Sequence, residues 1–201
     1  MAIATNLKKT LVLIFFFFLL SFSSSHAHCD SVNGPVVMAA KKTLETGNLN
    51  YVFIWINPED EKEITDLYEK IMKVRDLNGD VRVLVDTYFY ETVVRVHRMS
   101  EGVGYTGLKF EDFDPSEGIK AADKAIEMNS VDELLVHLSD EVQTERVKHS
   151  FTDLQTKRNF DIDDVNAGRE YVAAYVHFIH FVEELFEGGV NEHNHNETHK
   201  H

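Results

Sequence analysis

The stretch His28-Cys29-Asp30, near the start of the chain, holds residue types that bind transition metals. Cys29 is the only cysteine, so it cannot form a disulfide within the chain. If His28 is the first residue of a processed protein, its α-amine, the Cys29 backbone nitrogen and the Cys29 thiolate can chelate one metal. The His28 imidazole can add an axial nitrogen. Because a planar set of nitrogen and sulfur donors suits Cu(II) or Ni(II), the sequence predicts a metal hook. The alternative is a thiol that bridges two copies of the chain.

Two stretches of helical pattern carry His and Glu one helical turn apart. His97 and Glu101 are four residues apart, as are His180 and Glu184, and His177 lies one turn before His180. Helical bundles build metal sites from such side chains on facing helices, although the same pairs also occur on solvated helix surfaces. The full set of predicted metal ligands is His28, Cys29, His97, Glu101, His177, His180 and Glu184.

A second group of residues is predicted to orient the ligands rather than to bind the metal. Glu91 and Arg98 lie on the helix of His97, and Tyr105 lies in the glycine-rich stretch that follows it. For the charged residues, an ion-pair ladder along the helix is the alternative. For Tyr105, the alternative is a plain turn after a helix end. The predicted orienting residues are Asp30, Glu91, Arg98 and Tyr105.

The residues HCDSVNG, at 28–34, resemble the start of mature nickel superoxide dismutase, where an HCDxxCG hook holds the nickel. That enzyme is also a helical bundle, so the resemblance implies a nickel hook on an all-α fold. Asn33 stands where the dismutase has its second ligating cysteine. Because this thiolate is missing, we do not expect dismutase activity, whereas a metal hook of altered chemistry remains the expectation.

A wider resemblance covers nearly the whole mature chain. The motifs HCDxxxGPVV at the start, ETVVRVHR at 91–98 and EGVGYTGLK at 101–109 are similar to those of an exported family of unknown function. This resemblance implies that the hook, the 91–98 helix and the Tyr105-Thr106-Gly107 turn belong to one structural unit. It implies no particular activity.

The first 27 residues have the pattern of a signal peptide. Lys8 and Lys9 precede an apolar run at 10–20, and small residues at Ser25 and Ala27 suit cleavage after Ala27. The apolar run is shorter than the roughly 20 residues that span a bilayer, which makes an uncleaved anchor the second choice. We expect a secreted or extracytoplasmic protein that begins at His28.

Charge and composition restrict the partners. The chain carries a formal net charge of −14. We therefore expect no nucleic-acid partner and, once the leader is removed, no membrane partner, because both need clustered Lys and Arg. A homodimer remains open, and so does an unidentified small ligand. The predicted organisation is one helical domain at 28–189 and a disordered His-rich tail at 190–201.

Apolar residues at three-to-four spacing predict an all-α helical bundle. The sequence around Ala39 recurs at Ala121, and 88–101 is similar to 171–184. These similarities favour a duplicated three-helix unit with pseudo-two-fold symmetry, with halves at about 34–110 and 116–187. The expected helices lie at 35–46, 50–56, 58–76, 79–100, 117–128, 131–157 and 163–187.

Two functions follow from these observations. The first is a secreted helical protein that binds Ni or Cu through the N-terminal hook; if it is an enzyme, the predicted class is a metal-dependent oxidoreductase. The second is a non-enzymatic exported module that binds a ligand or partner, with Cys29 as an intermolecular bridge.

Overall fold

A computed structural model describes residues 29–110 and 114–196, with side chains to residue 188. The described chain contains eight α-helices, one 3-10 turn and no strand, which confirms the all-α prediction. The helices are α2 (Pro35–Thr46), α3 (Asn50–Phe53), α4 (Glu61–Met72), α5 (Gly79–Ser100), α6 (Glu117–Met128), α7 (Asp132–Leu135), α8 (Glu141–Lys157) and α9 (Val165–Asn196), and the 3-10 turn is η1 (Pro58–Asp60).

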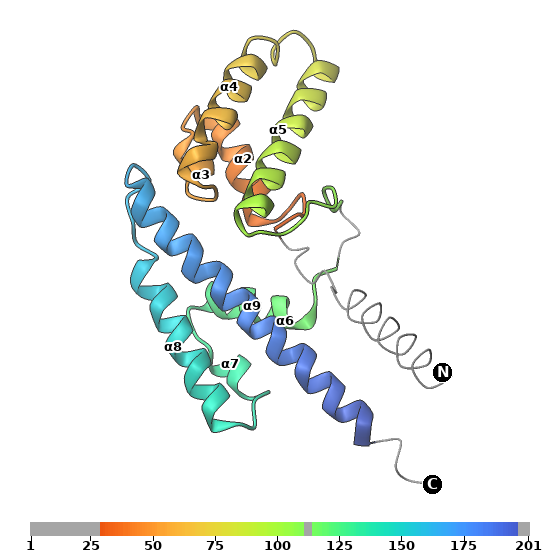
Figure 1. The fold of residues 1–201 in the computed structure, drawn as a ribbon, viewed down its shortest axis with the longest axis vertical. Coiled ribbons are helices and arrows are strands. Elements are labelled where there is room, and N and C mark those ends of the chain that lie inside the picture. Colours follow the sequence, from red (N-terminus) through yellow and green to blue (C-terminus); the bar gives the residue numbers. More distant parts are fainter. Residues whose placement is uncertain (1–28, 111–113, 197–201) are drawn as a thin grey trace, which may run out of the picture.

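The helices form two groups (Figure 1). In the first, α5 packs against α2 and α4, and in the second, α9 packs against α6 and α8. The beginning of α9 reaches back to the first group, where Gly168 lies against Ile54. One core therefore runs through both groups, with Phe89 and Phe178 among its fully buried side chains.

Polar caps fix where three of the longer helices begin. The side chains of Asn78, Ser116 and Asp140 accept hydrogen bonds from backbone N–H groups in the first turns of α5, α6 and α8. Such caps satisfy donors that a helix end leaves without partners. At the other end of α5, His97 and Arg98 lie in its last turn.

The structure corrects several predicted boundaries. The helix expected at 131–157 is divided into α7 and α8, because Asp140 is extended and caps a new helix. The helix expected at 58–76 begins as η1 and ends at Met72. The helix expected at 50–56 is present over its first four residues only, as α3. Helix α9 begins at Val165 and continues to Asn196, past the helix end predicted at 187.

The order of elements agrees with the predicted duplication. Helices α2 and α6 each have 12 residues, α3 and α7 each have four, and both pairs are offset by 82 positions. Both members of the first pair, α2 and α6, are followed by a residue in the left-handed region, Gly47 with φ 77° and Asn129 with φ 54°. The duplication itself stays a prediction, because a shared order of helices does not establish a common origin of the two halves.

The N-terminal segment is held against the loop that follows α5. The backbone N–H of Lys109 donates to Asp30 O at 2.8 Å, and that of Val32 donates to Lys109 O at 2.9 Å. These bonds form an isolated parallel bridge between Ser31 and Lys109. Cys29 is therefore placed next to the end of α5.

Gly118 lets α6 approach α9 closely, and replacing it with alanine is expected to destabilise the protein. A Cβ at this position would lie 2.7 Å from the Glu183 Cα, which is backbone and cannot move aside. We expect Gly118→Ala to lower the free energy of unfolding by about 1–3 kcal/mol despite its better helix propensity. Urea unfolding measures this, with Gly79→Ala, at an open position, as the control. Equal stabilities for the two variants would contradict the packing.

Candidate metal centre

Five polar residues gather where the N-terminal segment meets the end of α5. We call Cys29, Asp30, His97, Arg98 and Glu101 the junction cluster. Four of them are at most 5% exposed, and the Glu101 side chain is 16% exposed. Buried polar groups normally have hydrogen-bond partners, yet four atoms of this cluster have none in the structure. These atoms face one another in two pairs, Arg98 Nε with Asp30 Oδ1 at 3.4 Å and His97 Nε2 with Glu101 Oε1 at 3.5 Å. The four atoms are Asp30 Oδ1, His97 Nε2, Arg98 Nε and Glu101 Oε1.

The hydrogen bonds of His97 define its chemical state. Its Nδ1 lies 2.9 Å from the backbone oxygen of Trp55. A carbonyl can only accept, so Nδ1 must carry the proton and Nε2 keeps its lone pair in the neutral ring. Burial lowers the pKa of His97, which favours this neutral ring. The indole of Trp55 packs edge-on against the imidazole, with centroids 5.6 Å apart. A neutral imidazole with a free Nε2 lone pair is the form of histidine that can bind a metal ion.

Two carboxylates share one guanidinium in the cluster. Arg98 donates to Glu101 Oε2 at 3.0 Å, and its Nε lies 3.4 Å from Asp30 Oδ1 without a hydrogen bond. The other Glu101 oxygen lies 3.5 Å from His97 Nε2. Burial raises the pKa of Asp30, and the Arg98 charge opposes that rise. Lys109 also acts on Asp30 in the same direction as Arg98, so the two carboxylates are matched by two cations.

The Cys29 thiol is buried and protonated. Burial raises its pKa far above the ordinary value, and the nearby Glu101 charge adds to the effect. A neutral thiol is a poor nucleophile and a poor partner for disulfide exchange. The thiolate would form only if a cation bound beside it.

We therefore expect Cys29 to resist alkylation and oxidation in the folded, metal-free protein. Its reaction with a thiol-specific disulfide reagent at pH 8 should be at least about 100-fold slower than that of free cysteine, since access and thiolate fraction both fall. Unfolding in urea should restore the normal rate. A native rate near that of free cysteine would contradict the buried placement.

Helix α9 carries a second polar group, at its contact with the start of α6. Glu183, which is 2% exposed, accepts a hydrogen bond from Ser116 at 3.0 Å and lies 3.4 Å from His180 Nδ1. Burial is the main cause of the lowered pKa of His97, and the charges of Arg98 and His180 act in the same direction. A buried carboxylate that holds one nitrogen of an imidazole is the usual support of a metal-binding histidine.

Only some predicted site residues are brought together. Cys29, His97 and Glu101 lie in the junction cluster with Asp30 and Arg98, whereas His180 lies on α9, where it pairs with Glu183. Glu91, His177 and Glu184 are exposed, and the His177 ring stacks on Phe181. His28 and the predicted leader lie outside the described residues. The half-buried Tyr105 has a hydroxyl without a partner, and burial raises its pKa to about 12.

Sequence reasoning missed the buried carboxylate of α9 that pairs with His180. It paired His180 with Glu184 at four residues, whereas the structure pairs it with Glu183 at three. Glu183 follows buried Ile179 by four positions, so the apolar face of α9 was the available signal. The Trp55 carbonyl and the Ser116 hydroxyl carry no sequence signal for such a role.

Within the described residues, no three side chains of His, Cys, Asp or Glu are arranged so that they could hold a metal ion. A metal at the junction cluster would thus need donors from the segment that precedes Cys29. In the same part of the chain, no helix is long and apolar enough to cross a membrane.

The chain belongs to a family of unknown function, DUF6448, which it matches over residues 33–181. The match covers α2 to the first half of α9 and therefore both helical groups, including His97, Arg98, Glu101 and His180. No curated protein and no solved structure matches the chain.

Proposed function

We propose that this protein is a secreted helical metalloprotein that binds one Ni(II) or Cu(II) ion through a mature N-terminal His-Cys hook. The observation that carries the proposal is the pair of buried, unpartnered donor atoms His97 Nε2 and Glu101 Oε1, 3.5 Å apart and beside buried Cys29. Both atoms are lone-pair donors, and leaving them desolvated without a partner costs free energy.

Charge and tautomer support the same proposal. The Trp55 carbonyl fixes His97 with an open Nε2, and a backbone carbonyl in this position is a common support of metal-binding histidines. Asp30 and Glu101 are carboxylates largely removed from water, and a cation bound beside them would offset the cost of their desolvation. The thiolate of Cys29 would be stabilised by the same cation.

The hook would supply the remaining donors. In the proposed mature protein, the α-amine and imidazole of His28 directly precede Cys29, which the Ser31–Lys109 bridge keeps beside the cluster. Nitrogen and thiolate donors select Ni or Cu over the hard cations. If the protein is catalytic, a redox reaction of the bound metal is the class of activity we propose.

The test compares two proteins that differ by one residue. One begins at His28 and the other at Ala27, which moves the α-amine away from Cys29 but leaves every described contact in place. Calorimetric titration with Ni(II) should give one site in the first protein and at least about tenfold weaker binding in the second. His97→Gln should weaken binding of the first protein, whereas His149→Gln, at an exposed position, should not. Equal affinities of the two proteins would overturn the hook.

The second function, a module dimerised through Cys29, is disfavoured by one observation. The thiol is 5% exposed and its pKa is raised, so it is badly placed to form an intermolecular disulfide. Binding of a small ligand is a separate matter, because it does not need the thiol.

A further inference from the structure

We propose that a groove beside the N-terminal segment binds a small aromatic carboxylate, with Lys41 as the group that holds the carboxylate. The groove has a volume of about 540 Å³ and lies between the N-terminal segment, α2, α5 and the stretch at 108–110. Pockets for small ligands commonly measure roughly 300–1,000 Å³ and combine apolar walls with few polar groups. This site is distinct from the metal centre and does not rest on it.

Lys41 is the cation of the groove. Its ammonium group donates to the backbone oxygen of Val32 at 2.8 Å, which directs it toward the groove and leaves other donors available. Among the described residues, no carboxylate lies within ion-pair distance of Lys41. In a chain with a formal net charge of −14, a lysine without a carboxylate is well suited to an anion.

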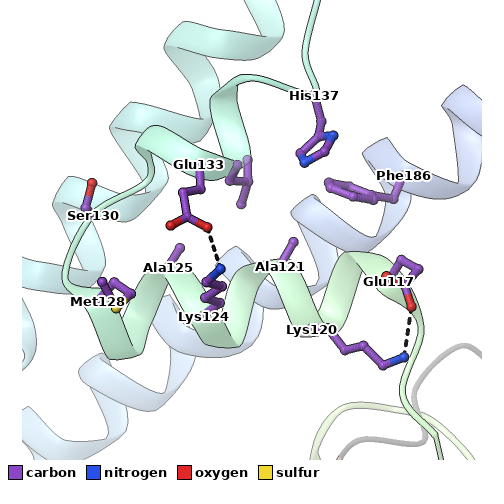
Figure 2. Close-up of a pocket in the computed structure, with 11 residues that line it drawn as sticks. Glu117, Lys120, Ala121, Lys124, Ala125, Met128, Ser130, Glu133, His137 and Phe186 are labelled. Atoms are coloured by element: carbon purple, nitrogen blue, oxygen red, sulfur yellow. Dashed lines mark hydrogen bonds and ion pairs between the residues drawn. The ribbon is translucent and has the colours of Figure 1, made fainter.

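A second hollow, between α6, α7 and α9, provides the contrast. It also contains lysines, but Lys120 is paired with Glu117 at 2.8 Å and Lys124 with Glu133 at 2.5 Å (Figure 2). Its volume is smaller, about 260 Å³. Because its lysines are already paired, an anion is favoured in the Lys41 groove instead.

The walls of the Lys41 groove indicate an aromatic ring as the other part of the ligand. Tyr90 is half-buried, Leu108 is buried and Phe110 is 61% exposed, so a flat ligand would cover an aromatic surface that now faces solvent. Asp86, beside Tyr90, is held by Arg75 through bonds of 2.6 and 2.8 Å. Its charge is therefore compensated, which limits repulsion of an incoming carboxylate.

Calorimetric titration with phenylacetate tests the proposal. The protein begins at His28, and EDTA is present so that a metal cannot contribute. We expect saturable binding at one site, and at least about tenfold weaker binding of the uncharged phenylacetamide, because a charge-assisted hydrogen bond is lost. Lys41→Met should weaken phenylacetate binding to the same degree. Lys42→Met, at the exposed neighbouring position, should leave it within about twofold.

Lys41 also donates to the Val32 backbone, so Lys41→Met removes a structural contact as well as the proposed anion-binding group. Phe110→Ala tests the ligand contact without that complication. This variant removes an exposed wall and keeps the Lys41 contact, and we expect phenylacetate to bind several-fold more weakly. Absence of saturable binding, or unchanged binding by Lys41→Met, would overturn the proposal. Hexanoate binding as tightly as phenylacetate would overturn the aromatic assignment. Cys29→Ser should bind phenylacetate with unchanged affinity. Failure of the groove proposal and failure of the metal-hook proposal can therefore be told apart.

Discussion

Replacing Arg98 with methionine is expected to lower the free energy of unfolding by about 3–5 kcal/mol. The side chain is 4% exposed, donates to Glu101 at 3.0 Å and lies 3.4 Å from Asp30. Methionine keeps much of the apolar stem but removes the only positive charge that the two carboxylates share in the junction cluster. Both would then be buried without compensation, which is costly in a medium of low dielectric constant. Urea unfolding of the metal-free protein at pH 7, followed by circular dichroism, measures the change.

Arg95 on the same helix supplies the control. It pairs with Glu63, but these side chains are 37% and 50% exposed. Arg95→Met should therefore cost no more than about 1 kcal/mol, because water screens an exposed pair. Adding Asp30→Asn to Arg98→Met should recover part of the lost stability. If the two arginine variants were equally stable, the junction cluster would not be the buried charge network that we describe.

The affinity for Ni(II) or Cu(II) is expected to rise at least about tenfold per pH unit between about pH 6 and pH 8. Burial, reinforced by Glu101, raises the pKa of the Cys29 thiol so far that it stays protonated across this range. Binding as a thiolate must therefore release a proton, and each lower pH unit increases proton competition tenfold. The free α-amine, whose ordinary pKa is about 8, steepens the dependence below that value. Competition titrations with a chelator of known affinity measure the slope.

Cys29→Ser is the matched variant for this experiment. Serine keeps the size and position of the side chain but cannot supply a thiolate, so the metal affinity should fall. The affinity should also depend less steeply on pH, because no thiol proton is released. The absorption bands of a metal–thiolate bond should also disappear. An affinity that does not depend on pH in the unsubstituted protein would show that Cys29 is not a ligand.

The helical fold was largely accessible from sequence because apolar periodicity and caps are local signals. The expected helix at 79–100 coincides with α5, and those at 35–46 and 117–128 coincide with α2 and α6. The break at Asp140 was missed, because the apolar pattern continues across it. The side chain of Asp140 caps α8 only because the Asp140 backbone is extended. The apolar pattern does not indicate this backbone conformation.

The candidate site could be predicted only where spacing along one helix determines proximity. His97 and Glu101 were paired correctly because residues four apart share a helix face. The same spacing rule gave His180 the wrong partner. Glu183 and Glu184, three and four residues later, both lie on the side of the helix that carries His180. Tertiary packing against α6, where Gly118 allows close approach, selected Glu183.

Contacts between segments far apart in the chain could not be predicted from the sequence. Nothing local indicates that the Trp55 carbonyl would fix the tautomer of His97, or that Arg98 would meet Asp30. These contacts depend on how the two helical groups and the N-terminal segment assemble. The parallel bridge between Ser31 and Lys109 is equally non-local, and it is what carries Cys29 into the core.

The measurement that tests the metal hook most directly uses protein exported by its own leader. Its N-terminus is sequenced and its metal content is read by elemental mass spectrometry, with Cys29→Ser prepared in parallel. We predict a chain that begins at His28 and carries close to one Ni or Cu ion, with the metal lost in the variant. A different first residue, or a chain without bound metal in either preparation, would contradict the account.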